Sequence, residues 1–235
     1  MNRLGKALLI LTAFAVALVM WWKFNYPTHA WKQKLTVTVT TPRGEVSGSS
    51  VVGVSWRKNL FSGGWGGALF HLTLQGEATA IDLGGGQFLF AILGYQRSEE
   101  PNDTGIIPLK LLRQRLPGES VDDYWSPDSF KRVLAARGRD PTVLPQKLYP
   151  RFLRFRDIND PTTAELVDPA DLAKSFGPGV GLARVTIEIT DDAVTWGIRK
   201  ILPWLSRQVG WFPLNGADIP PIGPANLIDF DTLRK

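Results

Sequence analysis

The chain contains no cysteine. This absence excludes disulfide bonds, zinc sites built on thiolates, thiol nucleophiles and a lipid-modified N-terminal cysteine. Histidine is scarce as well, since only His29 and His71 occur among 235 residues. A Ser-His-Asp triad would have to use one of these two. His71 lies between Phe70 and Leu72 in a predicted strand, where we expect a structural role.

Several enzyme motifs are also missing. There is no G-x-S-x-G nucleophile elbow. The glycine-rich residues 62–67 lack the G-K-[ST] of a phosphate-binding loop, so we interpret them as a strand connection, with Phe61 and Trp65 as the alternative contact to a membrane or partner. Ser55 and Lys58 have the S-x-x-K spacing, but that chemistry requires adjacent turns of a helix, and these residues end a predicted strand.

Acidic residues form no strong site in the sequence. The segment 157–161 (DINDP) carries hard oxygen ligands, and four of its residues locally resemble the calcium-linker motif of cadherins. An Asx turn before the proline is the simpler interpretation. Glu77 and Asp82 flank a predicted strand and are expected at the surface. The sequence therefore assigns no catalytic, metal-binding or cofactor-binding residue.

Charge is distributed unevenly. The net charge is +5, but residues 110–156 hold 11 Lys or Arg and 5 Asp or Glu, a local charge of +6. This stretch could face anionic lipid or an acidic partner. A solvated surface with locally paired arginines is the simpler interpretation. Nucleic acid binding is not expected, because no helix-turn-helix, zinc knuckle or aromatic RNA-binding motif is present.

One long apolar run is present at residues 7–22, followed by Lys23. As a helix, these 16 residues span about 24 Å, less than a hydrocarbon core of about 30 Å. Residues 4–24 extend the span if the flanking lysines snorkel. The nearest signal-peptidase site, ending at Ala30, is poor. We therefore predict an uncleaved membrane anchor; a cleaved signal peptide and a buried core helix are the alternatives.

The charges around the apolar run give only a weak orientation signal, because positive residues lie on both sides. The short stretch before it favours an N-terminus in the cytoplasm and a body in the periplasm of a bacterium. The predicted parts are a membrane anchor at 1–24, a juxtamembrane linker at 25–33, an extracytoplasmic domain at 34–209 and a proline-rich extended tail at 210–235.

Period-two alternation and β-branched residues predict mostly strands. The predicted strands are residues 34–41, 46–56, 68–74, 76–83, 87–93, 151–157 and 184–190. Capping signals predict helices at 127–137, 169–176 and 193–208, with Pro203 kinking or splitting the last one. No βαβ alternation occurs, so the expected fold class is α+β: an antiparallel sandwich or barrel with two or three short helices, preceded by one transmembrane helix.

The predicted last helix mixes aromatic and basic residues. It either lies on a bilayer or covers the open face of a sheet, and the second interpretation is favoured. The aromatic and basic residues concerned are Trp196, Arg199, Lys200, Trp204, Arg207, Trp211 and Phe212.

Together these features predict a single-span envelope protein of the bacterial inner membrane, with a binding or assembly role rather than catalysis and with no cofactor. Its expected partners are the bilayer, through residues 4–24, and either another envelope protein or anionic lipid. Residues 110–156 and the tryptophans of the last helix form the expected contact surface. An anchored periplasmic hydrolase with an unrecognised site is the alternative from another class. A module that binds lipid or glycan through exposed tryptophans is the third interpretation.

Overall fold

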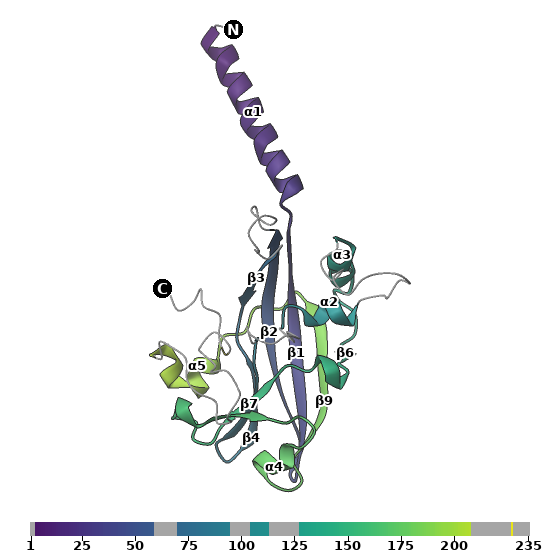
Figure 1. Cartoon of the computed structure of the whole chain (residues 1–235), viewed down its shortest axis with the longest axis vertical. Coiled ribbons are helices and arrows are strands. Elements are labelled where there is room, and N and C mark those ends of the chain that lie inside the picture. The colour runs from purple at the N-terminus through teal and green to yellow at the C-terminus, as the bar shows by residue number, and fades with distance from the viewer. Residues whose placement is uncertain (1–2, 59–69, 95–103, 113–126, 208–226, 228–235) are drawn as a thin grey trace, which may run out of the picture. The chain divides into compact units, whose positions relative to one another are not determined.

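The computed structural model describes residues 3–58, 70–94, 104–112, 127–207 and 227 (Figure 1). The chain forms two compact units. One contains residues 1–30 and 55–73, and the other contains residues 31–54 and 74–235.

The first unit contains helix α1, Arg3–Asn25. Its described side chains, residues 10–21, are all exposed. After the helix, Tyr26 meets Trp21 edge-to-face, with ring centroids 6.3 Å apart. Among the described residues, no helix combines the length and the mean hydropathy that a membrane crossing requires.

The described strands form two sheets. Across the first sheet the order is β3 (Phe70–Gln75), β2 (Gly44–Lys58), β1 (Thr28–Thr41), β9 (Gly181–Thr190) and β6 (Thr142–Val143). Across the second the order is β4 (Thr79–Gly84), β5 (Gln87–Ala91), β7 (Phe152–Phe155) and β8 (Ala164–Val167). The pairs β1–β9, β6–β9, β4–β5, β5–β7 and β7–β8 are all antiparallel.

The main core lies between these sheets. Alternating residues of β1, namely Leu35, Val37 and Val39, point into it, since successive side chains of a strand face opposite ways. The opposing sheet contributes apolar residues such as Ile81 and Leu89. Each such side chain, when fully buried, stabilises the fold by roughly 1.5–3 kcal/mol. The alternation visible in the sequence is therefore what assembles the sandwich.

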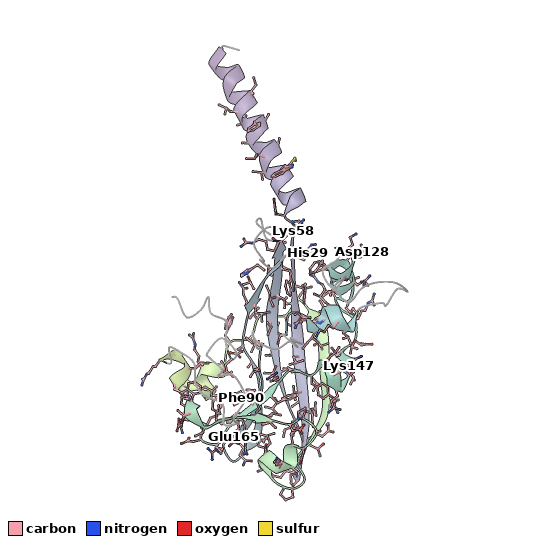
Figure 2. The ribbon with its side chains drawn as sticks, in the orientation of Figure 1. His29, Lys58, Phe90, Asp128, Lys147 and Glu165 are labelled. Atoms are coloured by element: carbon pink, nitrogen blue, oxygen red, sulfur yellow. The ribbon has the colours of Figure 1, made fainter. Side chains whose placement is uncertain are left out.

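A second core covers the other face of the four-stranded sheet. Here Phe90, labelled in Figure 2, is buried on β5. It meets Phe155 on β7 edge-to-face, with ring centroids 5.7 Å apart. Short helix α5 (Ile198–Ile201) and 3₁₀ helix η4 (Pro203–Ser206) close this core together with Leu227, which lies in the segment predicted as an extended tail. The backbone N–H of Ala78 donates to the Leu227 carbonyl at 2.8 Å, which fixes this residue in place.

Smaller elements complete the second unit. These are α2 (Ile107–Leu111), α3 (Pro127–Ala135), 3₁₀ helix η2 (Gln146–Leu148), 3₁₀ helix η3 (Pro161–Thr163) and α4 (Leu172–Phe176). Helix α4 is capped by the Asp171 carboxylate, which accepts from Lys174 N at 3.2 Å, and it ends at Gly177 with φ of 98°. The α+β class, with antiparallel sheets and a few short helices, is confirmed.

Several predicted boundaries differ from those observed. Strand β1 starts at Thr28, within the predicted linker 25–33, and Trp31 is buried. The strands β6 and β8 were not predicted from the sequence, because two and four residues are too few to show a period. The 3₁₀ helices and α2 are too short to carry a helical stripe for the same reason.

The helix predicted over 193–208 begins later than expected, and residue 208 lies outside the described residues. Residues 193–197 are not helical, because Thr195 pairs with β2 instead. Its N–H donates to the Val51 carbonyl at 3.0 Å, and its hydroxyl accepts from Val51 N at 2.9 Å. Pro203 splits the remainder into α5 and η4, as the sequence predicted.

Candidate functional site

The S-x-x-K residues do not form a serine–lysine site. Ser55 and Lys58 both lie on β2, where residues three apart point to opposite faces (Figure 2). The two histidines are also separate. His71 is exposed on β3, whereas His29 is partly buried on β1, where loss of hydration lowers its pKa and favours the neutral imidazole.

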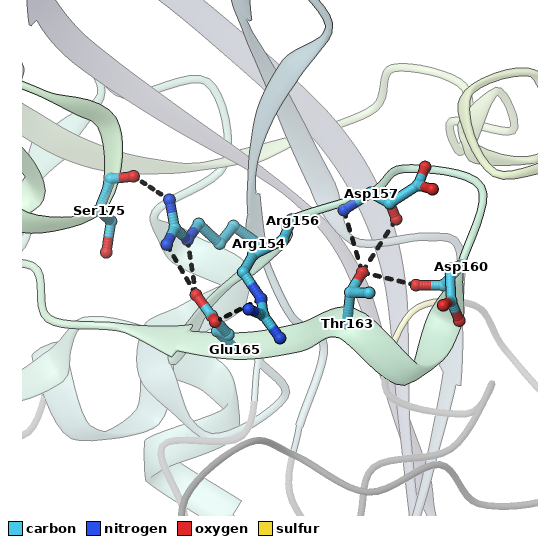
Figure 3. A network of polar contacts seen from close by, with 7 residues as sticks. All are labelled: Arg154, Arg156, Asp157, Asp160, Thr163, Glu165 and Ser175. Carbon is cyan, nitrogen blue, oxygen red and sulfur yellow. Dashed lines mark hydrogen bonds and ion pairs between the residues drawn. The ribbon is translucent and has the colours of Figure 1, made fainter.

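The segment 157–161 forms Asx turns, as the simpler interpretation predicted. Figure 3 shows how Asp157 and Asp160 also bind the Thr163 hydroxyl. Asp157 Oδ1 accepts from Asn159 N at 2.9 Å, and Asp160 Oδ1 accepts from Thr162 N at 2.8 Å. Hydrogen bonds from the hydroxyl and the N–H of Thr162 lower the pKa of Asp160. Within the described residues, no three His, Cys, Asp or Glu side chains gather as a metal site would require.

A nearby ion-pair network joins three elements (Figure 3). Arg154 on β7 donates from Nε and Nη2 to Glu165 Oε2 on β8, at 2.9 and 2.7 Å. Its Nη1 donates to the Ser175 carbonyl of α4. Arg156 Nε contacts the second oxygen, Oε1, at 2.8 Å. Since both carboxylate oxygens are held by guanidinium groups, Glu165 ties the sheet together and is poorly placed to accept a proton from a substrate.

Much of the basic stretch 110–156 is paired in the same way. Lys131 contacts Asp128 at 3.1 Å, and Arg137 contacts Asp191 at 3.3 Å. With Arg154 and Arg156, four of its cations therefore have acidic partners, which confirms the interpretation of local pairing for these four. Arg113 and Arg115 lie outside the described residues.

Glu77 is not at the surface, which corrects the expectation from the sequence. It is only 5% exposed, and its Oε2 accepts from the backbone N–H groups of Gly197, at 2.5 Å, and Ile198, at 2.8 Å. Asp82 is exposed as expected, and it accepts from Gly84 N at 2.8 Å. The two carboxylates have separate backbone partners, so they do not act as an acid–base pair.

The two described tryptophans near the C-terminus lie in different environments. Trp204 packs inward: its ring meets Phe155 at 5.3 Å, and its Nε1 donates to the Ile158 carbonyl at 2.9 Å. Ile198, Leu202 and Leu205 are buried beside it. This confirms that the segment covers a sheet face. Trp211 and Phe212 lie outside the described residues.

A group of exposed residues in this segment is mostly basic, and we call this group the Trp196 face. Trp196 has 47% of its surface exposed, a high fraction for so large an apolar side chain. No Asp or Glu occurs in residues 193–207. The face consists of the exposed residues Trp196, Arg199, Lys200, Pro203 and Arg207. Of the surfaces described here, it is the one that combines an exposed aromatic ring with several cations.

Comparisons with protein-family models, with curated proteins and with solved structures find no match to this chain.

The inward role of Trp204 is testable by Trp204→Phe. Phenylalanine keeps an aromatic ring against Phe155 but loses the donor to the Ile158 carbonyl. We expect the free energy of unfolding to fall by about 1 kcal/mol, measured by chemical denaturation. The matched control Trp196→Phe, at an exposed position, is expected to change it by less than about 0.5 kcal/mol. Equal effects of the two variants would contradict this assignment.

Proposed function

We propose that this protein is a membrane-tethered binding or assembly protein, with α1 in a bilayer and the α+β body beside it. One observation supports this most strongly: eight large apolar side chains of α1 are 55–68% exposed. Soluble proteins rarely leave so long an apolar surface in water. The residues are Ile10, Leu11, Phe14, Val16, Leu18, Val19, Met20 and Trp21.

The composition of α1 supports insertion in lipid. Apart from Thr12, its described side chains are apolar, and they cover every side of the helix, as expected where the surroundings are lipid on all sides. Moving each large apolar side chain from water into hydrocarbon contributes roughly 1.5–3 kcal/mol. The whole of α1 has 23 residues and rises about 34 Å, comparable to a hydrocarbon core of about 30 Å. Residues 10–21, whose side chains are described, are too few to cross by themselves, so the proposed span needs the full helix.

The proposed arrangement is a single span at residues 4–24, with the N-terminus in the cytoplasm and the body in the periplasm of a bacterial inner membrane. Lys6 and Lys23 flank the apolar run, where their ammonium groups can reach the head groups. Tethering concentrates the body in a thin layer beside the membrane. A weak contact with a membrane-embedded partner then becomes effective without a large interface.

The tether is tested by fractionating cells that express the full chain. We expect the protein to stay in the membrane pellet after high-salt and alkaline washes, with an intact mass that excludes cleavage. The double variant Leu11→Asp, Phe14→Asp places two charges in the middle of α1, each costing about 3 kcal/mol there. We expect it to leave the pellet, whereas the matched body variant Arg139→Asp stays.

Removal of residues 1–24 should leave a folded body that no longer sediments with membranes. Aggregation of the truncated chain would indicate that the apolar run belongs to the core, and the tether proposal would fail.

Because the chain has no cysteine, Asn2→Cys and Arg139→Cys each give one labelling site. An impermeant maleimide added from the periplasmic side should label only Arg139→Cys. The assembly role further predicts a stoichiometric partner after mild detergent extraction, and repeated recovery of the chain alone would argue against it.

A further inference from the structure

We propose that the Trp196 face binds the anionic head groups of the bilayer that holds α1. This proposal rests on the proposed function, because it assumes that the body stays close to a membrane. It assigns a second, peripheral lipid contact to a part of the body far from α1 in the sequence.

The cations of this face have no acidic partner among the described residues. Arg199, Lys200 and Arg207 are exposed. The cations that do pair with carboxylates lie elsewhere, namely Arg137, Arg154 and Arg156. On the N-terminal side, the nearest acids in the sequence are engaged elsewhere, and Asp218, on the C-terminal side, lies outside the described residues. Asp191 contacts Arg137 at 3.3 Å, and Asp192 contacts Lys34 at 3.6 Å.

The buried carboxylate of Glu77 lies beneath the face and offsets part of this charge. Its Oε2 binds the N–H groups of Gly197 and Ile198, so the charge faces the protein interior. Three exposed cations against one buried carboxylate leave the outer surface positive. An anionic leaflet attracts such a surface, and each added cation near it strengthens the contact about fivefold.

The face is held in a fixed conformation before any ligand binds. Thr195 pairs with Val51 on one side of Trp196, and Glu77 holds Gly197 on the other. Behind the face, Ile198, Leu202 and Leu205 are buried in the second core. The segment therefore cannot turn its exposed side inward without unfolding, and Trp196 stays exposed as a side chain of the kind that favours a membrane interface.

The occupant is assigned to lipid rather than to protein because the face is small, cationic and aromatic, and because tethering supplies a lipid surface at high local concentration. An interface with another protein would need a larger complementary area, typically about 800 Å² per partner. Three cations and one exposed indole provide a weak contact with lipid. A weak contact is sufficient because the tether keeps the body close to the membrane.

The test uses the full chain in nanodiscs of phosphatidylcholine alone and of phosphatidylcholine mixed with phosphatidylglycerol. Ser206, exposed beside the face, is changed to cysteine and labelled with a fluorophore. Brominated acyl chains quench the fluorophore when it lies at the membrane. We expect quenching in the phosphatidylglycerol discs and little in the others. A label at Ala183→Cys, exposed on β9, reports the background.

The charge-removing triple variant Arg199→Gln, Lys200→Gln, Arg207→Gln should lower the equilibrium constant for the lipid contact about a hundredfold, close to the product of its single effects. The matched control removes three exposed cations elsewhere, by Arg57→Gln, Lys58→Gln and Arg139→Gln, and should keep the quenching. Trp196→Ala should weaken the contact while leaving its dependence on phosphatidylglycerol.

The outcomes separate this proposal from the tether. Failure of the chain to co-elute with phosphatidylcholine discs would overturn the tether. Co-elution with equal quenching in both kinds of disc would overturn the lipid contact alone and would favour an acidic protein as the partner of this face. Loss of quenching in the control triple variant would also overturn it, because a general charge effect would then explain the result.

Discussion

Gly48→Ala is expected to destabilise the body by about 3 kcal/mol. At the size of this domain, that loss lowers the melting temperature by roughly 10 °C. The reason is a close approach of two strands. A Cβ at position 48 of β2 would lie 2.1 Å from the Ala80 carbonyl oxygen and 3.0 Å from Ile81 Cγ1 on β4. A backbone carbonyl cannot move aside as a flexible side chain can, so the sheets must separate.

The same separation would disturb a buried polar contact. Ser50 and Thr79 hydroxyl oxygens lie 2.6 Å apart at this junction, and moving the strands would leave buried hydroxyls unpaired. Circular dichroism during heating measures the effect.

The matched control is Gly181→Ala on β9. Nothing lies within 4 Å of a Cβ at that position, and neither Gly48 nor Gly181 has a positive φ. The two substitutions therefore differ in available space and not in backbone strain. We expect Gly181→Ala to change the melting temperature by less than about 2 °C. A Gly48→Ala protein as stable as this control would show that the two sheets do not meet as described.

Glu77→Ala is expected to lower the free energy of unfolding by about 2–3 kcal/mol and to loosen α5. The substitution removes the acceptor of two backbone N–H groups, those of Gly197 and Ile198. A buried donor left without a partner costs about 1–3 kcal/mol, and the desolvation of Glu77 that is relieved offsets part of this. Hydrogen exchange of residues 195–202 should become faster than in the unchanged protein.

Glu188→Ala is the matched control. Glu188 pairs with Lys34 at 3.4 Å, with 25% of its side chain exposed, so its loss should cost less than about 1 kcal/mol. It should also leave hydrogen exchange of α5 unchanged. If Glu77→Ala instead matched this control in both measurements, the buried carboxylate would not be what holds the segment.

The lipid contact of the Trp196 face should weaken in Glu77→Ala, since the face would lose its fixed conformation.

Some of this architecture could be predicted from local patterns in the sequence. Residues 34–41 alternate strictly, and they form part of β1 with Leu35, Val37 and Val39 in the core. Pro203 interrupts a helix because it lacks the N–H that the helix needs. The Asx turns at 157–161 follow from side chains that bind backbone groups two residues away. In each case the interacting groups are close in the sequence.

Other features depend on partners that are distant in the sequence. Glu77 looked like a surface acid because nothing near it shows that its partners are 120 and 121 residues away. The residues around Gly48 are small, but nothing in the sequence shows that β4 lies against them. Thr195 leaves the predicted helix because β2 supplies a carbonyl and an N–H for it to bind.

Trp196 and Trp204 show which features the local sequence predicts and which depend on partners that are distant in the sequence. The residues around them predicted an amphipathic segment with a basic side, and that pattern of apolar and charged positions is a local property of the chain. Which indole turns inward depends on whether the neighbouring segments supply a carbonyl acceptor and an aromatic ring for it to contact. Ile158 and Phe155 provide both for Trp204, and Trp196 is left exposed among cations. Local periodicity encodes the faces of an element, whereas the neighbour of each face is set when separate segments pack.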